Sequence, residues 1–158
     1  MKIKFKWMLL LIISGMVALT SFLGCSSKYE SVTLPQGMTS VETVQFYFEQ
    51  WNNKNIEGMD SVVCDEMKGA DFGMSELVYA RLNKSNEETE KHMSLEGAYF
   101  NDTFPGYIKY SIIEVEFEIE YKKSSGGFPS GKSNINNWIY VLGKTSEGSD
   151  WIIISWGV

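Results

Sequence analysis

Few residues in this chain of 158 are of a type and spacing that could carry chemistry. The chain contains two cysteines, Cys25 and Cys64, and one histidine, His92. Two cysteines are too few for a metal site or a disulfide scaffold. His92 is a candidate general base, because histidine is the side chain best suited to proton transfer near neutral pH. Its polar context Glu-Glu-Thr-Glu-Lys-His instead predicts a surface residue without a nucleophile beside it.

Four glutamates alternate with apolar residues within 106–123, at Glu114, Glu116, Glu118 and Glu120. Such a row could bind a divalent cation. Same-face neighbours on a strand lie about 6.8 Å apart, so adjacent carboxylates cannot share one ion without oxygens from elsewhere. We therefore predict no metal or other cofactor here, but a solvated outer face with lysines opposite on neighbouring strands.

The segment 126–133, Gly-Gly-Phe-Pro-Ser-Gly-Lys-Ser, matches the phosphate-binding pattern G-x-x-x-x-G-K-[ST]. That loop works only when a strand enters it and a helix leaves it, because the helix N-terminus supplies the N–H groups that hold phosphate. Here the following residues indicate a loop and then a strand, and Pro129 removes one N–H donor. The sequence therefore predicts a hairpin loop and no nucleotide.

Cys25 ends the long apolar run of the chain. Lys2, Lys4 and Lys6 precede this run, which extends over 7–23 and has the layout of a secretory signal peptide. The run ends in Leu-Gly-Cys followed by polar residues, which resembles the lipobox of bacterial lipoproteins. The resemblance implies that residues 1–24 are a signal peptide and that Cys25 carries diacylglycerol, usually with an acylated amino terminus.

The residues around Cys25 leave two alternatives to lipid attachment open. An apolar run of this length lies at the short limit for a membrane-spanning helix, about 17–25 residues, so the run could stay as an uncleaved anchor. Cys25 could also form a disulfide with Cys64. If Cys25 is lipidated, Cys64 has no partner within the chain, and its apolar-spaced segment predicts a buried, inert thiol.

The charge of the chain excludes some classes of partner. Its net charge is −6, and it becomes about −9 without residues 1–24, which contain three lysines and no acidic residue. An acidic domain is a poor ligand for nucleic acid and is repelled by an anionic membrane surface. The membrane is therefore expected to hold this protein only through its lipid, with residues 25–37 as a tether and 38–158 as one folded domain.

Two helices are predicted at the start of that domain. Thr39 and Glu42 form a capping box. The apolar residues of the first helix then follow at spacings of three and four, which indicates one buried stripe ending near Asn52-Asn53. These residues are Val41, Val44, Tyr47, Phe48 and Trp51. Asn55 can cap a second helix that includes Ile56 and Met59 and extends to about Met67.

Beyond the helices the apolar period changes to two, which is typical of strands. The segment 106–123 alternates most clearly, with buried-type residues on one face and the glutamates on the other. The other predicted strands are 75–85, 138–145 and 151–158, the last two forming a hairpin after a loop at 124–137. Residues 87–106 are ambiguous, with a short strand near 98–100 and a turn at Pro105-Gly106.

Helices at one end of the chain, followed by antiparallel strands, predict an α+β domain with a helix pair packed on a curved antiparallel sheet. The capped aromatic helix, the turn Asn52-Asn53-Lys54-Asn55 and the terminal Trp-Ile-Ile-Ile-Ser-Trp-Gly resemble the nuclear transport factor 2-like (cystatin-like) superfamily. More closely, residues 38–158 resemble an uncharacterised domain of that fold in small Gram-positive bacterial lipoproteins. The resemblance implies a cone with a pocket at its open end.

Five rings are candidates to line such a pocket, although rings at these spacings more often form a core. They are Tyr47, Trp51, Tyr110, Trp138 and Trp156. A cone-fold enzyme also needs a carboxyl group that faces a dry cavity. Asp60, Asp65 and Asp71 border the helices, but the pattern does not predict any of them to be buried.

Three hypotheses of function follow. We favour a lipid-anchored, extracytoplasmic, non-enzymatic module that binds a small ligand or an envelope protein at the cell membrane. The second is a cone-fold lyase, isomerase or hydrolase that uses a pocket carboxylate. The third is an interaction partner that uses the outer face of the sheet, which requires an exposed apolar patch there.

Overall fold

The computed structural model describes residues 36–124, 128–133 and 135–157, and of residues 95–101 only the backbone. All described residues belong to one compact unit, Val32–Val158. The predicted signal peptide, most of the tether and Cys25 lie outside the described residues. Within the described part of the chain, no helix is long and apolar enough to cross a membrane.

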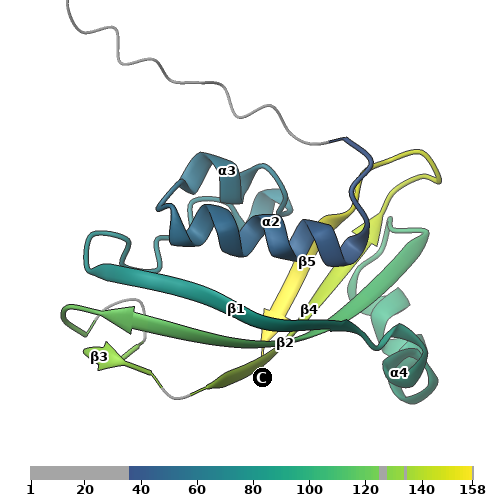
Figure 1. The fold of residues 1–158 in the computed structure, drawn as a ribbon. Helices are drawn as coiled ribbons and strands as arrows, with labels where there is room; N and C mark the ends of the chain where they lie inside the picture. The colour runs from purple at the N-terminus through teal and green to yellow at the C-terminus, as the bar shows by residue number, and fades with distance from the viewer. Residues whose placement is uncertain (1–35, 125–127, 134, 158) are drawn as a thin grey trace, which may run out of the picture. The chain divides into compact units, whose positions relative to one another are not determined.

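The domain is α+β, with its N-terminal helices packed on an open antiparallel sheet, as the sequence predicts (Figure 1). In chain order the elements are α2 (Ser40–Asn52), α3 (Ile56–Asp60), the short 3₁₀ helix η1 (Asp65–Met67), β1 (Leu77–Glu87), α4 (Thr89–Thr103), β2 (Lys109–Tyr121), β3 (Gly131–Lys132), β4 (Asn136–Lys144) and β5 (Ile152–Gly157).

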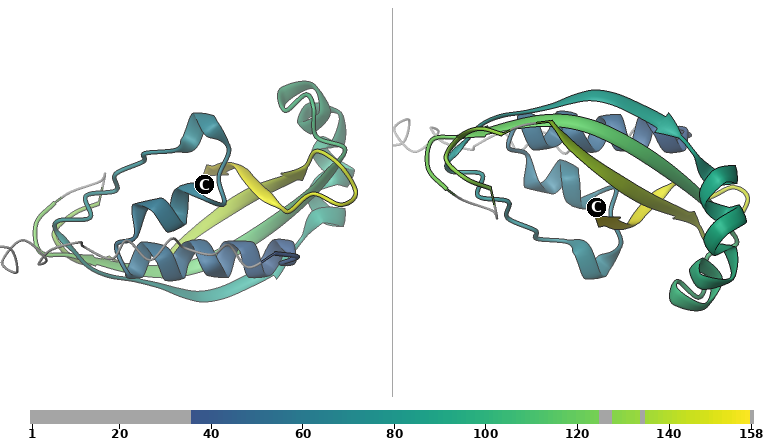
Figure 2. Two further views of the ribbon diagram at one scale, coloured as in Figure 1. Left: turned by 90° about the horizontal axis from the view of Figure 1, so that it is seen from above. Right: turned by 90° about the horizontal axis from the view of Figure 1, so that it is seen from below.

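The sheet has the order β1-β2-β4-β5, and the short β3 pairs with one end of β2. All these pairs are antiparallel. We call the face that α2 covers the inner face. Helix α4 lies at one end of the opposite, outer face, as the view from below shows (Figure 2). The curvature of the long strands is visible in the same figure.

Helix α2 begins as its capping box predicts. The Thr39 side chain accepts a hydrogen bond from the Glu42 backbone N–H at 3.2 Å, and the Glu42 carboxylate accepts one from the Thr39 N–H at 2.7 Å. The predicted apolar stripe of this helix is confirmed, because Val44, Tyr47, Phe48 and Trp51 are buried. Their side chains therefore direct α2 onto the inner face.

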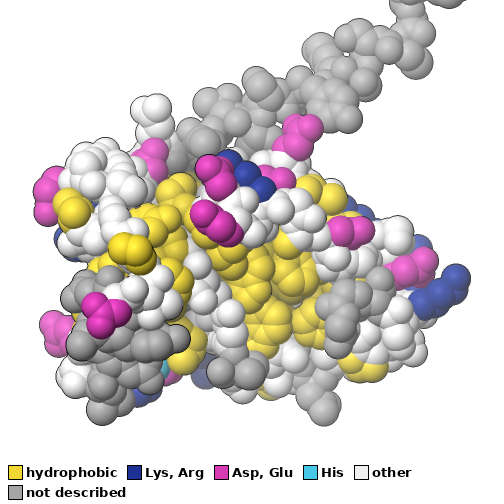
Figure 3. Space-filling view, turned by 180° about the vertical axis from the view of Figure 1, so that it is seen from behind, with side chains coloured by type: hydrophobic (Ala, Val, Ile, Leu, Met, Phe, Trp, Pro, Cys, Tyr) yellow, Lys and Arg dark blue, Asp and Glu magenta, His cyan; other side chains and the backbone are white. Residues whose placement is uncertain are grey.

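Aromatic rings fill the space between α2 and the inner face. Trp51 has no exposed surface, and its nearest ring neighbours are Phe72 at 4.9 Å and Phe48 at 5.5 Å between centroids. Ring contacts link ten residues into one cluster: Tyr47, Phe48, Trp51, Phe72, Phe117, Tyr121, Phe128, Trp138, Tyr140 and Trp156. We call this set the ring cluster. Hydrophobic side chains also form a continuous area in the middle of the rear face (Figure 3).

A second, smaller core lies on the outer face under α4. It is built on Ile112, Val141 and Ile154, against which Met93 and Tyr107 pack. The Thr89 hydroxyl accepts a hydrogen bond from the Ile112 backbone N–H at 2.9 Å and so attaches the start of α4 to β2. The sheet is thus covered by helices on both faces, but on the outer face only at one end.

The predicted strand near 98–100 is wrong, because these residues lie in α4. A local apolar pattern cannot distinguish a short strand from a helix that is held by distant contacts. Here the helix begins where the Glu88 N–H donates to Ile112 O and the His92 N–H donates to Glu88 O. The turn at Pro105-Gly106 is confirmed, and Gly106 has a φ of 101° that favours glycine.

The second helix is shorter than predicted. Asn55 caps α3 as expected, its side chain accepting from the Gly58 N–H at 3.1 Å, but the helix ends at Asp60. The chain then turns so that Val63 forms a parallel bridge with Ile153 of β5. The prediction failed because Val62 and Val63 have an apolar spacing compatible with a helix but are buried beside a strand distant in sequence.

The strand predictions hold, with shifted ends. Strand β1 is displaced by two residues from the predicted 75–85, and β4 and β5 form the predicted hairpin. The loop at 124–137 also contains the short strand β3. The predicted alternation of β2 is confirmed, because its inward residues Ile113, Val115, Phe117, Ile119 and Tyr121 are all buried.

Replacing Trp51 with alanine is expected to lower the free energy of unfolding by about 3–5 kcal/mol, because the change leaves a cavity in the ring cluster. Urea denaturation followed by circular dichroism measures this difference. Ile108→Ala is the control, since Ile108 is 60% exposed and its truncation should change stability by no more than about 0.5 kcal/mol. Equal stability of the two variants would contradict the burial of Trp51.

Gly143→Ala is expected to destabilise the second core by about 1–3 kcal/mol. A Cβ atom at Gly143 would clash with Cδ1 of the Tyr107 ring, so the ring must move. Gly148→Ala is the matched control, because a Cβ there meets nothing within 4 Å. The change in melting temperature of each variant measures the effect, and a Gly143→Ala protein as stable as the control would refute the contact.

Candidate functional site

The four glutamates of β2 face the outer side of the sheet and are half-buried there. Lysines lie opposite three of them, two on neighbouring strands as predicted and one, Lys91, on helix α4. Lys91 Nζ is 2.7 Å from Glu114 Oε1, Lys84 Nζ is 3.7 Å from Glu116 Oε2, and Lys132 Nζ is 3.0 Å from Glu118 Oε2. Among the described residues, no group of three or more potential ligands could hold a metal ion.

The pairing of three strands places six of the outer-face residues in a grid. One row across β1, β2 and β4 contains Asn86, Glu114 and Ile139, and the next row contains Lys84, Glu116 and Asn137. Directly opposed residues on antiparallel strands have Cβ atoms about 4.5–5.5 Å apart. The six side chains therefore share one small area, which we call the grid.

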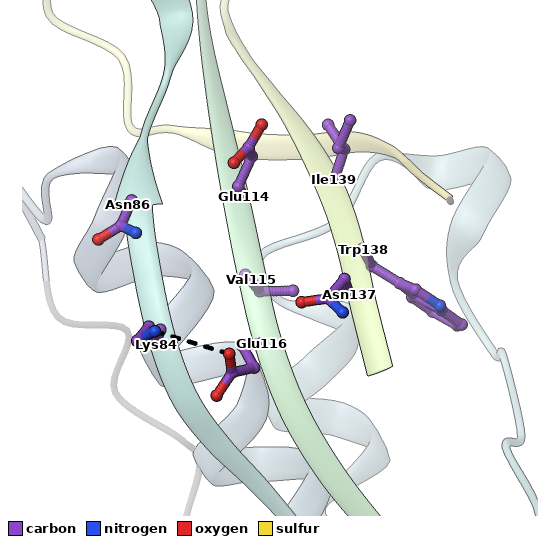
Figure 4. Close-up of a pocket in the computed structure, with 8 residues that line it drawn as sticks. All are labelled: Lys84, Asn86, Glu114, Val115, Glu116, Asn137, Trp138 and Ile139. Carbon is purple, nitrogen blue, oxygen red and sulfur yellow. Dashed lines mark ion pairs between the residues drawn. The ribbon is translucent and has the colours of Figure 1, made fainter. Parts of the chain in front are cut away.

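A hollow of about 460 Å³ lies over the grid (Figure 4). Val115 and Trp138 also contribute to its lining, although Trp138 extends away from the other side chains in Figure 4. The side chain of Val115 belongs to the inner core, so Val115 contributes to the lining of the hollow through the backbone of β2. The hollow therefore combines carboxylate, amide and ammonium groups with one aliphatic side chain, Ile139.

Two partners from helix α4, Lys91 and His92, hold the Glu114 carboxylate in place. Hydrogen bonds from Lys91 and then from His92 hold the pKa of Glu114 below its ordinary value, and Glu114 in turn raises the pKa of Lys91. His92 is not an exposed residue as predicted. Only 16% of its side chain is accessible, and its Nε2 lies 3.0 Å from Glu114 Oε1. Helix α4 brings these two residues to the sheet, which the sequence pattern could not indicate.

The five rings predicted to line a pocket lie in two places. Tyr47 and Trp51 are fully buried in the ring cluster, to which the half-buried Trp138 and Trp156 also belong. Tyr110 packs instead against the second core, and its hydroxyl donates to Phe104 O at 2.9 Å. The structure thus brings four of the five rings together.

The polar atoms of the ring cluster do not form a reactive site. Burial raises the pKa of Tyr47 and of Tyr140, so both phenols stay neutral, and it raises the pKa of Tyr121 to about 12. The buried Trp51 Nε1 has no hydrogen-bond acceptor at suitable geometry among the described residues. The same indole nevertheless acts to lower the pKa of Tyr121, against the larger effect of burial. The buried polar side chains of the described residues are the uncharged Ser40, Thr43, Gln50 and Ser111.

The three aspartates near the helices hold loops. Asp60 Oδ1 accepts from the Gly69 N–H at 2.8 Å, and Asp71 Oδ1 accepts from the N–H groups of Gly73 and Met74 at 2.9 Å each. Asp65 pairs with Lys68, Nζ to Oδ1 at 2.6 Å, which lowers the pKa of Asp65. These bonds give each carboxylate a role in shaping the segment between α3 and β1.

Cys64 is half-buried beside the second core, not enclosed in the main core as predicted. Its backbone N–H donates to Ile153 O at 2.9 Å, so its position follows from the pairing with β5. Burial, together with a hydrogen bond to Glu66, raises the pKa of the thiol. A raised pKa reduces the thiolate fraction and hence the reactivity of this cysteine.

The described part of the glycine-rich segment contains a short strand. Gly131 and Lys132 form β3 opposite Tyr121 and Glu120, and β4 begins at Asn136. Lys132 is directed to Glu118 on the outer face. The helix that a phosphate-binding loop needs at its exit is therefore replaced by a strand.

Comparison with known protein families gives a match over most of the chain. Residues 41–157 match the family described as "Domain of unknown function (DUF4829)", which covers nearly the whole described domain. No curated protein matches the chain significantly, and no solved structure does.

Glu114→Gln is expected to remove an acid-sensitive part of the stability. Because the pKa of Glu114 is lowered in the folded state, its contribution is present above the unfolded pKa and is lost as the pH falls through the folded pKa. The wild type should therefore exceed the variant in unfolding free energy by less than about 1 kcal/mol near neutral pH. This difference should disappear in acid.

Urea denaturation at several pH values between neutral and acid measures the effect. Glu120→Gln is the control, since Glu120 lies on the same face of β2 but forms no ion pair within the described part of the chain. A difference that grew as the pH fell would refute the assignment.

Proposed function

This chain belongs to the DUF4829 family, and we propose that it is a lipid-anchored, extracytoplasmic binding module at the cell membrane. The segment Leu23-Gly24-Cys25, after a basic start and an apolar run, supports lipid attachment at Cys25. Two or three acyl chains anchor a protein durably, whereas one chain holds it only marginally. Residues 25–37 then serve as the tether of an acidic domain.

We further propose that the domain is a variant of the nuclear transport factor 2-like cone. The α2 helix on the inner face of an open, curved sheet supports this assignment (Figure 1). In this domain the side of the sheet where a cone would hold its ligand is occupied by the ring cluster. A ligand site is therefore expected elsewhere.

The observation that carries the binding proposal is the open polar hollow over the grid, beside an inner core filled by rings. A cone-fold lyase, isomerase or hydrolase needs a carboxyl group in a dry cavity, where desolvation prepares it for proton transfer. The buried polar side chains of the described residues are uncharged, and the hollow is lined by carboxylates that already have cationic partners. These features favour binding over catalysis.

The same hollow favours a small ligand over a protein partner on the outer face. Docking of a protein is expected to use a sizeable apolar patch. The part of the outer face that α4 leaves uncovered instead carries the glutamates and their lysines. Such a charged surface favours contact with water.

Cys25→Ala is expected to abolish lipid attachment and cleavage by the lipoprotein-specific peptidase, because the thioether cannot form. Metabolic labelling with palmitate, together with the mass of the chain isolated from the membrane fraction, measures both events. Cys64→Ala is the matched control and should be labelled and cleaved like the wild type. A labelled and normally cleaved Cys25→Ala protein would contradict the proposed anchor.

A further inference from the structure

We propose that the hollow over the grid binds a neutral ligand rich in hydroxyl groups, such as a sugar residue of a glycan. This inference rests on the proposed binding function and adds the chemical class of the ligand. It is argued from the charge balance of the grid, its hydrogen-bonding groups and its placement on paired strands.

The charges of the grid are balanced within the protein. Glu114 is paired with Lys91 and His92, and Glu116 faces Lys84. A cationic ligand would have to compete with these lysines for the carboxylates. An anionic ligand would meet two carboxylates in a chain whose net charge is −6. Neither kind of charge is therefore favoured, which leaves a neutral ligand.

The hydrogen-bonding groups of the grid suit hydroxyl groups. Asn86 and Asn137 lie in adjacent rows on either side of β2, and neither amide has a hydrogen-bond partner among the described residues. Each amide offers two donor hydrogens and an acceptor oxygen, and a carboxylate offers acceptors only. A hydroxyl group both donates and accepts, so a polyol can bridge the amides and the carboxylates at once.

The spacing of the strands and the position of Glu114 are set before any ligand arrives. The side chains of the grid stand on three paired strands, and Lys91 and His92 fix Glu114 from the side of α4. A preorganised site loses less conformational entropy on binding. Ile139 is half-buried at the end of one row, next to Glu114, and can contact the apolar C–H face of a sugar ring.

The test uses the purified full-length chain in detergent micelles and isothermal titration calorimetry. The neutral probes are maltotriose, the trisaccharide of N-acetylglucosamine and myo-inositol; the charged probes are inorganic phosphate and spermidine. At least one neutral probe should bind, with an affinity that changes little with salt, because screening acts only on charged partners. Binding of a saccharide but not of inositol identifies a sugar ring as the ligand, and the reverse identifies a simple polyol.

The matched variants are Asn86→Ala and Asn137→Ala, with Asn83→Ala as control. Asn86→Ala and Asn137→Ala should each lower the affinity for the neutral probe about five-fold, which is the equivalent of one hydrogen bond. Asn83 is an exposed asparagine of the same strand β1 but does not line this hollow. Its replacement should leave the affinity unchanged. Unchanged circular dichroism and urea midpoints verify that all three variants fold.

Other outcomes overturn the inference in distinguishable ways. Saccharide binding that neither asparagine variant weakens would refute the site. If only phosphate or spermidine binds, and Asn137→Ala weakens that binding, the proposed ligand class is refuted. The proposed binding function is then retained. Binding of no probe would refute the inference, and native mass spectrometry of the chain isolated from its membrane then tests the binding function separately. In that measurement a co-purified ligand would support the proposed binding function. The absence of any co-purified ligand would count against that function.

Discussion

The two faces of β2 are the constraint on which the rest of the domain depends. This strand lies between β1 and β4, and its residues alternate between a core packed by α2 and an outer face of glutamates. A slip of one residue in its pairing would bury the carboxylates and expose Phe117 and Ile119. Because that exchange is so unfavourable, the register of all three strands is strongly specified, and the grid inherits its arrangement from the register.

The ring cluster determines which side of the sheet can serve a ligand. Rings are large and rigid, and tilted or edge-to-face pairs stabilise a core beyond the area that they bury. Once Trp51, Phe72 and their neighbours occupy the inner side, the buried phenols there stay neutral. The inner side is then suited to stability, and the polar chemistry of the domain is left to the outer face.

Helix α4 connects the second core with the candidate site. At its start, Thr89 bonds to the backbone of β2, while Met93 packs into the second core. Between them, Lys91 and His92 reach Glu114. The same attachment that buries one end of the outer face therefore fixes one wall of the polar area beside it, so the apolar packing of α4 and the electrostatics of the grid are coupled.

The sequence by itself determined the elements whose signals are local. The capping box of α2, the alternation of β2 and the β4–β5 hairpin follow from side-chain period and backbone chemistry, which act within a few residues. The row of glutamates on one face of β2 was predictable for the same reason. Only the tertiary structure decided that 89–103 is a helix, that α3 stops at Asp60, and that His92 meets Glu114. These outcomes depend on contacts between residues far apart in the chain, about which a local pattern carries no information.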